Sequence, residues 1–297
     1  MTARTRQLTN LVVRCFFDQD RTSTCQYVVW DQQTRHAAIL DSVLDLDINT
    51  GRVEFNNANR ILEFVQSNKL LVKWILDTHI HADHLTASAY LKKRLSETNP
   101  TVCIGKGITL VQETFKRKYR LSDDFKTDGS QFDLLLQNDQ ILPLGNLEIR
   151  CLDTPGHTPD HMAYEVGDSV FVGDTLFMPE VGSARCDFPN GSAELLEQSV
   201  RNKIFTLNEL TKIYVGHDYG RDEPKWVASV AEQKKCNIHL NTAISKEQFI
   251  QMRNARDAKL AAPKLLHFAL QVNMRAGRFD GNELLVRIPI TSEIDLS

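Results

Sequence analysis

The sequence predicts a mixed α/β fold for a chain of 297 residues, and three observations lead to this fold class. First, 42% of the residues are hydrophobic and 25% are charged, a balance typical of one large globular domain or two modest ones. Second, short apolar runs bounded by polar turns alternate with segments whose apolar residues recur at helical spacing. Third, this alternation occurs twice, so the chain contains two halves in which strands are followed by helices.

The first half begins with three short strand-like runs that polar turns separate. A helix follows, because apolar residues recur at helical spacing after an Asn-rich start. Strands and helices then alternate, as expected for strand, helix, strand units. In chain order, the predicted elements are the strands LVVRCFF, CQYVVW and HAAILDSV, the helix NNANRILEFVQSNKL, the strand VKWILDT, a helix over about residues 85–95, the strand TVCIG and a helix around TLVQETFKRKY.

The second half returns to strands after the polar loop LSDDFKTDGSQFD. Its predicted elements are the strands NLEIRCLDT, HMAYEV and SVFVGDTLF, a helix over about residues 193–205, the strand TKIYVGHD and a helix near residues 227–235. The remaining tail contains one predicted helix and one late predicted strand. We therefore expect a core over residues 1–235 and a C-terminal extension over residues 236–297 that packs on the core.

The charge and the cysteine spacing exclude several classes of protein. A formal net charge of −3 and a pI near 6.3 argue against nucleic-acid binding, so we expect a small-molecule partner. The N-terminal segment has no long apolar region, and no apolar run is long enough to span a bilayer, which predicts a cytoplasmic protein without membrane contact. The cysteines lack C-x-x-C spacing, which fits a reducing compartment; they are Cys15, Cys25, Cys103, Cys151, Cys186 and Cys236.

Clustered histidines and aspartates follow four of the predicted strands. The four segments are THIHADH after VKWIL, TPGHTPDH after LEIRCL, GDTLF after SVFV and GHDYG after KIYV. Loops at strand ends on one edge of a sheet can bring such residues into one pocket. Nitrogen and oxygen ligands without thiolate suit zinc, iron or manganese in an open, reactive site. The candidate residues are His79, His81, Asp83, His84, His157, Asp174 and His217.

The ordered set of motifs resembles the metallo-β-lactamase superfamily. The motifs are H-x-H-x-D-H at residues 79–84, G-H-T at His157, G-D-T at Asp174 and G-H at His217, spread in this order over roughly the first 235 residues. The resemblance implies an αββα sandwich, a fold that would require the two strand-then-helix halves described above. Within the superfamily, the chain looks like the branch of glyoxalase II and the persulfide dioxygenases. The segments GHDYG, GSARCDF and VNMR are similar to those of the persulfide dioxygenases.

The resemblance implies an iron-dependent persulfide dioxygenase. Such an enzyme holds one Fe(II) per chain, here on His79, His157 and Asp174, and oxidises glutathione persulfide with O2 to sulfite and glutathione. Two histidines and one carboxylate on one face of an octahedral ion leave positions open for dioxygen beside the substrate. The other four candidates then either hydrogen-bond to the ligands or bind a second metal; they are His81, Asp83, His84 and His217.

Two pocket residues are expected near this centre. Tyr219, two residues after His217, is a candidate catalytic and substrate-binding hydroxyl. Arg185 follows Asp174 along the chain and is a candidate for the glutathione carboxylates, with a structural ion pair to Asp187 as its alternative.

The tail and two further residues carry weaker expectations. Asn273, Met274 and Arg275 are candidates for closing over a peptide-like substrate, although core packing explains Met274 equally well. His161, four residues after His157, is expected to hydrogen-bond to backbone. Cys186 has an open role, either as a redox thiol or as a small packed side chain.

Two rival functions remain open at this stage. The first is a dinuclear-zinc thioester hydrolase of the glyoxalase II kind, because it shares every metal-binding position. The second is a non-catalytic binding domain on the same fold, although such domains usually lose ligands and none is missing here. A homodimer is compatible with the sequence but is not required by it.

Overall fold

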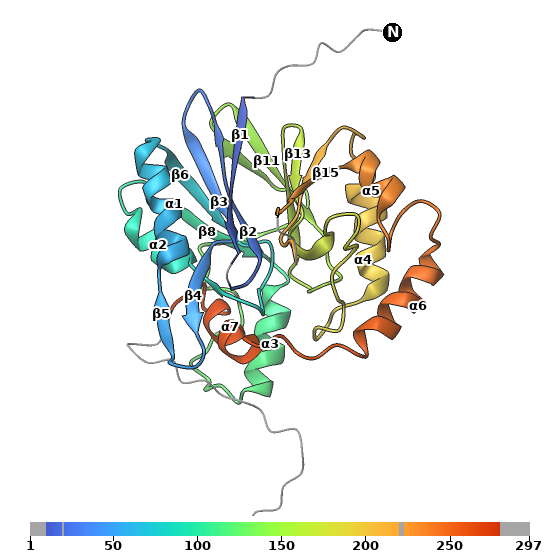
Figure 1. Ribbon diagram of the computed structural model, residues 1–297. Helices are drawn as coiled ribbons and strands as arrows, with labels where there is room; N and C mark the ends of the chain where they lie inside the picture. Colours follow the sequence, from blue (N-terminus) through green and yellow to red (C-terminus); the bar gives the residue numbers. More distant parts are fainter. Residues whose placement is uncertain (1–9, 20, 220–222, 280–297) are drawn as a thin grey trace, which may run out of the picture.

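The structure is a computed structural model that describes residues 10–19, 21–219 and 223–279, and its layers are those of an αββα sandwich (Figure 1). Two six-stranded sheets face each other, and helices cover the outer face of each sheet. The predicted fold class is therefore confirmed. Among the described residues, none of the helices combines the length and apolarity needed to cross a membrane.

The first sheet has the strand order β1-β2-β3-β6-β8-β9. Its first three strands pair antiparallel, and β3, β6, β8 and β9 pair parallel. Parallel neighbours need crossover connections, and helices supply two of them between β3 and β8. The strands are β1 (Leu11–Asp18), β2 (Thr24–Asp31), β3 (His36–Leu40), β6 (Leu71–Leu76), β8 (Thr101–Gly105) and β9 (Leu134–Leu136).

The second sheet has the order β10-β11-β12-β13-β14-β15, and a small third sheet has the order β5-β4-β7. In the second sheet only β13 and β14 are parallel. Its strands are β10 (Ile141–Leu144), β11 (Leu147–Asp153), β12 (Met162–Val166), β13 (Ser169–Phe171), β14 (Lys212–Tyr214) and β15 (Val227–Ser229). The small sheet contains β4 (Val43–Asp47), β5 (Arg52–Glu54) and β7 (Leu85–Thr86).

Amphipathic helices form the outer layers. In α1, for example, Ile61, Leu62 and Val65 are buried at helical spacing, as the sequence predicts. The first sheet packs against α1 (Asn56–Ser67), α2 (Ser88–Arg94), α3 (Ile108–Lys118) and α7 (Leu266–Asn273). The second sheet packs against α4 (Ala193–Ser199), the π-helical turn η2 (Val200–Ile204), α5 (Val230–Cys236) and α6 (Lys246–Asp257).

A third apolar cluster lies between the two sheets. Tyr27 and Leu76 of the first sheet meet Tyr164 and Phe171 of the second, and all four side chains are buried. The aromatic pair Tyr27 and Phe171 packs edge to face with ring centroids 5.2 Å apart. This packing fixes the sheets relative to each other, so the loops at their ends are also held in a fixed relation.

The tail differs from its prediction. It contains two helices, α6 and α7, where the sequence predicts one, and the predicted late strand lies outside the described residues. Helix α6 packs beside α4, whereas α7 contributes Leu270 and Val272 to the cluster under the first sheet. The boundary at residue 235 stays a prediction, but the described part of the extension packs on both halves.

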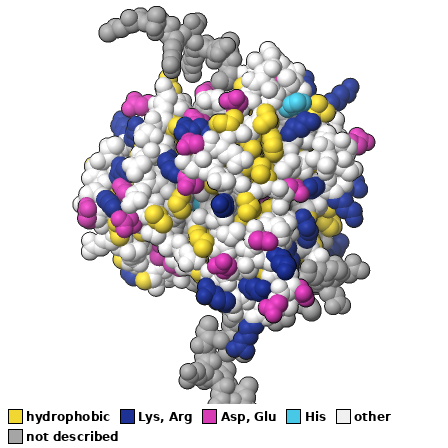
Figure 2. All heavy atoms as spheres, turned by 180° about the vertical axis from the view of Figure 1, so that it is seen from behind, with side chains coloured by type: hydrophobic (Ala, Val, Ile, Leu, Met, Phe, Trp, Pro, Cys, Tyr) yellow, Lys and Arg dark blue, Asp and Glu magenta, His cyan; other side chains and the backbone are white. Residues whose placement is uncertain are grey.

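The surface on the far side carries charges of both signs. Figure 2 shows Lys and Arg side chains interspersed with Asp and Glu over this face, with smaller groups of hydrophobic side chains between them. An interspersed pattern of this kind does not create the single-sign field that attracts a polyanion. All six cysteines are free thiols, as their spacing predicts.

Candidate metal centre

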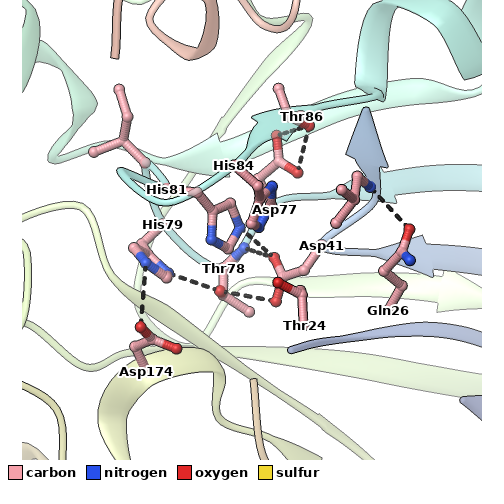
Figure 3. Close-up of polar contacts among 12 residues, drawn as sticks. Thr24, Gln26, Asp41, Asp77, Thr78, His79, His81, His84, Thr86 and Asp174 are labelled. Atoms are coloured by element: carbon pink, nitrogen blue, oxygen red, sulfur yellow. Dashed lines mark hydrogen bonds and ion pairs between the residues drawn. The ribbon is translucent and has the colours of Figure 1, made fainter. Parts of the chain in front are cut away.

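Three predicted metal ligands lie together where strands of the two sheets end. His79 follows β6, His157 lies between β11 and β12, and Asp174 lies in the 3-10 turn η1 (Gly173–Thr175) after β13. Their ligand atoms all lie within 4.8 Å of one another. Nε2 of His79 and Nε2 of His157 are 4.0 and 3.7 Å from Oδ2 of Asp174. Figure 3 shows His79 and Asp174 facing each other across this space.

These separations suit a shared metal ion better than direct hydrogen bonds. Distances of 3.7 and 4.0 Å are too long for hydrogen bonds, whereas two ligands about 2.1 Å from one ion lie roughly 3 to 4 Å apart. Within the described residues, the buried Oδ1 of Asp174 has no hydrogen-bond partner. A Cβ atom at Gly216 would lie 2.7 Å from that oxygen, so this glycine keeps the space open. The donor set and the space both fit a metal.

The Nδ1 atoms of both ligand histidines are held by neighbouring groups. Nδ1 of His157 lies 2.7 Å from the carbonyl oxygen of Arg185, and Nδ1 of His79 lies 3.0 Å from Oγ1 of Thr78. Donation from Nδ1–H to these oxygens leaves each Nε2 lone pair for a metal. Burial and the nearby His81 lower the pKa of His79 well below its usual value, so this imidazole is neutral and ready to bind.

Asp41 holds two residues beside the metal ligands, and it is not among the candidates predicted from the sequence. Its Oδ2 accepts a hydrogen bond from Oγ1 of Thr78 at 3.0 Å, and its Oδ1 lies 3.1 Å from Nε2 of His81. Burial alone would lower the pKa of His81, but the Asp41 carboxylate raises it to about 9. The signal in the sequence is a carboxylate directly after β3, yet nothing there shows which loop it meets.

A second group of donors lies beside the first. His81, Asp83 and His84 also have ligand atoms within 4.8 Å of one another. Nε2 of His217 lies 3.4 Å from Oδ2 of Asp83 and 3.5 Å from Oδ1 of Asp174, so it connects the two groups. Within the described part of the chain, Nδ1 of His81, Oδ2 of Asp83 and Nε2 of His84 are buried without a hydrogen-bond partner. This geometry offers ligands for a second ion as well.

The protonation states of Asp83 and His84 in the second group also suit a metal, whereas the raised pKa of His81 keeps this imidazole protonated beside Asp41. Burial alone would raise the pKa of Asp83, but the neighbouring His217 and His84 lower it to about 2. Burial and repulsion from His81 lower the pKa of His84 to about 4. At neutral pH, Asp83 is therefore a carboxylate and His84 a neutral imidazole, which are the forms that bind metals.

His161 positions a ligand through the backbone. Its Nε2 accepts a hydrogen bond from the backbone N–H of Asp174 at 3.1 Å, and its Nδ1 lies 2.9 Å from Oγ1 of Thr154. The predicted hydrogen bond to backbone is confirmed. His161 thus fixes the turn that presents Asp174.

An open groove runs over the metal ligands. It has a volume of about 400 Å³, and His157, Asp174, Phe177 and Tyr219 are among the residues that line it. A neighbouring hollow of about 590 Å³ shares Tyr219 with the groove. The ring of Tyr219 is 49% exposed and stacks on His217 with centroids 5.2 Å apart. This places Tyr219 at the edge of the cluster, so its predicted role there remains open to test.

Arg185 lines the groove but already has partners. Its Nε and Nη2 each donate to the Asp187 carboxylate at 2.6 Å, and its Nη1 donates to the carbonyl oxygen of Ala261 at 2.7 Å. The ion pair with Asp187, the alternative that the sequence left open, is therefore what forms. Cys186 is buried, and burial raises the pKa of its thiol, so it is an inert packed side chain rather than a reactive thiolate.

The structure does not bring the tail residues into the groove as substrate contacts. Met274 is fully buried, in agreement with its packing alternative. Asn273 is buried and bonds to the loop that carries His84. The guanidinium of Arg275 lies 4.7 Å from the ring centroid of Phe125 and lines a separate hollow. Their predicted substrate roles depended on closeness in sequence to a motif, which does not fix where a side chain lies.

Arg256 is the cation in the groove that the sequence analysis missed. It lies on α6, is exposed, and lines the same groove as His157 and Asp174. Among the described residues it has no ion-pair partner, in contrast to Arg185. A single arginine on a polar helix carries no signal in the sequence, because its role depends on where the helix packs.

Comparisons with known proteins agree with this geometry. The family profile described as Metallo-beta-lactamase superfamily matches residues 26–217. The crystal structure of ETHE1 from Myxococcus xanthus has a TM-score of 0.71 and 32% identity to this chain, and the match covers 90% of this chain and 100% of that one.

Two sequence relatives carry different names. Glyoxylase B2 of Dictyostelium discoideum is 46% identical over 281 residues, which cover 92% of this chain and 95% of the relative. The protein named persulfide dioxygenase ETHE1, mitochondrial, of Homo sapiens is 29% identical over 256 residues, which cover 86% of this chain and 84% of the relative. One name is that of a glyoxylase and the other is that of a persulfide dioxygenase.

Proposed function

The chain belongs to the metallo-beta-lactamase superfamily, and from this premise we propose that it is an iron-dependent persulfide dioxygenase that converts glutathione persulfide, O2 and water to sulfite and glutathione, with two of the sulfite oxygens from O2 and the third from water. The set of His79, His157 and Asp174, with both Nε2 atoms directed at one carboxylate, supports a metal centre, and the observation that carries the choice of a dioxygenase is the likeness to ETHE1. The likeness to the Myxococcus ETHE1 structure over that whole chain supports the dioxygenase branch.

Three residues would hold the metal, and others orient these ligands or line the groove. Iron held by His79, His157 and Asp174 would supply the redox chemistry with O2. The carbonyl oxygen of Arg185 and the hydroxyl of Thr78 keep the two imidazoles in the orientation that binding requires. Phe177 lines the groove and presents an apolar wall that restricts water around the reacting sulfur.

Arg256 supplies the charge that a glutathione carboxylate requires. A charge-assisted hydrogen bond contributes roughly 1.5–3 kcal/mol, so Arg256→Ala should raise the KM for glutathione persulfide about 10- to 100-fold with little change in kcat. Steady-state oxygen uptake measures both constants. Lys259→Ala, which removes an exposed cation just after α6 and outside the groove lining, is the matched control and should leave both constants unchanged.

The same measurement compares the other two arginines. Arg185→Ala and Arg275→Ala test the residues that the sequence indicated, and the geometry predicts smaller KM effects than for Arg256→Ala. A small persulfide without carboxylates should remove the difference between Arg256→Ala and the unmodified protein. An equal loss on both persulfides would show that Arg256 does not bind glutathione.

The second candidate is a dinuclear-zinc hydrolase of glutathione thioesters. Two observations favour it, the unpartnered atoms of Asp83 and His84 in the described cluster and the 46% identity to Glyoxylase B2. In that reaction two ions would activate a hydroxide for attack on a thioester carbonyl. The arrangement of donors alone accommodates either enzyme.

One pair of assays separates the two functions. Iron-loaded protein should consume one O2 per glutathione persulfide and form sulfite, and it should hydrolyse S-lactoylglutathione slowly or not at all. Rapid S-lactoylglutathione hydrolysis by the zinc-loaded protein, without oxygen uptake by the iron-loaded protein, would replace the dioxygenase with the hydrolase.

A further inference from the structure

The last residue of α7 holds the loop that carries His81, Asp83 and His84, three of the candidate ligands. Asn273 is 3% exposed, and its amide makes three hydrogen bonds to this loop. Nδ2 donates to the carbonyl oxygens of His81 and His84 at 2.9 and 2.8 Å, and Oδ1 accepts from the backbone N–H of Thr86 at 2.9 Å. Every polar atom of the side chain is thus used on residues 81–86.

Helix α6 holds a second loop in the same manner. Arg253 and Asp257 are 2% and 5% exposed and form an ion pair, with Nε of Arg253 donating to Oδ1 of Asp257 at 2.8 Å. Oδ2 of Asp257 accepts from the backbone N–H of Cys186 at 2.7 Å, and Nη1 of Arg253 donates to the carbonyl oxygen of Ser183 at 3.1 Å. Between these two contacts lies Arg185, the residue whose carbonyl oxygen bonds to Nδ1 of His157.

We propose that Asn273 and the Arg253–Asp257 pair are positioning residues of the metal centre, so that the C-terminal extension takes part in building the site. None of the three residues belongs to the proposed ligand set of His79, His157 and Asp174. The inference depends on that proposed set. Asn273 acts on the loop that begins just after His79, and the ion pair acts on the carbonyl group that orients His157.

Removing the amide of Asn273 leaves two backbone carbonyl groups and one backbone N–H group buried without partners, which destabilises the protein unless the loop moves. Movement of the loop relieves that cost but displaces His81, whose contact with Asp41 is connected through Thr78 to Nδ1 of the ligand His79. Removing the Asp257 carboxylate likewise leaves the backbone N–H of Cys186 buried without a partner, unless the loop around Arg185 moves. A change in either helix therefore reaches the metal through loop position rather than through direct contact.

Binding of Co²⁺ to the purified full-length chain tests the proposal independently of any reaction. The affinity is measured by competition with a chelator, the visible spectrum of bound Co²⁺ reports its coordination, and thermal unfolding of the metal-free protein reports stability. Asn273→Leu and Asp257→Ala should each weaken Co²⁺ binding about 10- to 100-fold, as loss of outer ligand partners does elsewhere. Asp257→Asn keeps an oxygen for Cys186 N–H and should lose less affinity than Asp257→Ala.

Two control variants separate positioning from general stability. Asn57→Leu removes a buried amide that also bonds to three groups, on Asp45, Gln26 and Arg60, none of which lies in a ligand loop or in α7. Arg201→Met removes an i, i+4 ion pair with Glu197 together with hydrogen bonds to two carbonyl groups, again away from the ligand loops. Both controls should lower the unfolding temperature and keep the Co²⁺ affinity and spectrum.

The results divide clearly. Normal Co²⁺ affinity and spectrum in Asn273→Leu and in Asp257→Ala would overturn the proposal, and so would an equal loss of affinity in the controls. If Asn273→Leu does not fold, the Co²⁺ affinities of the two Asp257 variants decide. The proposal requires weaker binding in Asp257→Ala than in Asp257→Asn. Retention of Co²⁺ by His79→Ala would refute the ligand set and this inference with it. Intact Co²⁺ binding without oxygen uptake would count against the proposed dioxygenase only.

Discussion

Replacing His79, His157 or Asp174 by Ala should leave purified protein almost without iron and without persulfide-dependent oxygen uptake. Each residue is one of only three protein ligands in the proposed centre, so each loss removes a large share of the chelate. His84→Ala and His217→Ala should keep most of the iron and lower the activity about 10- to 100-fold, because those residues act beside the ligands. These expectations are checked by measuring the iron content per chain and the oxygen uptake of the same preparations.

The comparison among these five variants also separates one metal from two. In a dinuclear centre His84 and His217 would be ligands themselves. Equal metal loss in all five variants would therefore contradict the mononuclear assignment. Thermal unfolding of each metal-free variant serves as the control for folding.

Replacing Asp41 by Asn should destabilise the metal-free protein by an amount that depends on pH. The raised pKa of His81, about 9 against an ordinary 6.5, corresponds to stabilisation on the order of 3 kcal/mol. Because the folded pKa is the higher one, this contribution is fully present below about pH 6.5 and is lost as the pH rises through 9. Asn is the suitable replacement, since φ of Asp41 is +49°, a region that Asn tolerates.

The measurement is the free energy of unfolding in urea at several pH values for both proteins. The difference between them is compared above pH 8, because Asp77, whose pKa burial and the Asp41 charge raise to about 7, titrates below that range. Asp31→Asn is the matched control: Asp31 is buried and its carboxylate accepts hydrogen bonds from Thr34 and Asn146, away from the histidines. Its effect should not decline above pH 8. A difference for Asp41→Asn that does not shrink over this range would exclude the ion pair with His81.

The sequence was sufficient where a residue directly follows a strand. His79 follows β6, and Asp174 and His217 follow β13 and β14, so strand prediction alone placed them at one edge of the sandwich. The two alternating halves also predicted the layers of the sandwich, because apolar periodicity determines which face of a helix or strand is buried.

Residues that act across the fold could not be found in this way. Asp41 and Arg256 lie far from the ligands in sequence and were not identified, and Asn273 was identified only as a substrate contact, because the place of each depends on how its element packs. Arg185 lines the groove but pairs with Asp187, and Arg275 lines a separate hollow, so a place near a motif did not determine what each guanidinium meets. The tail was the least predictable part, because α7 owes its position to the apolar cluster under the first sheet.

Anomalous diffraction at the iron absorption edge, from crystals of the anaerobically purified iron-loaded protein, tests the central claim most directly. The account predicts one iron peak per chain, within roughly 2.0–2.3 Å of Nε2 of His79, Nε2 of His157 and the Asp174 carboxylate. Two peaks per chain, the second bound by Asp83, His84 and His217, would contradict the mononuclear dioxygenase centre and establish a dinuclear one.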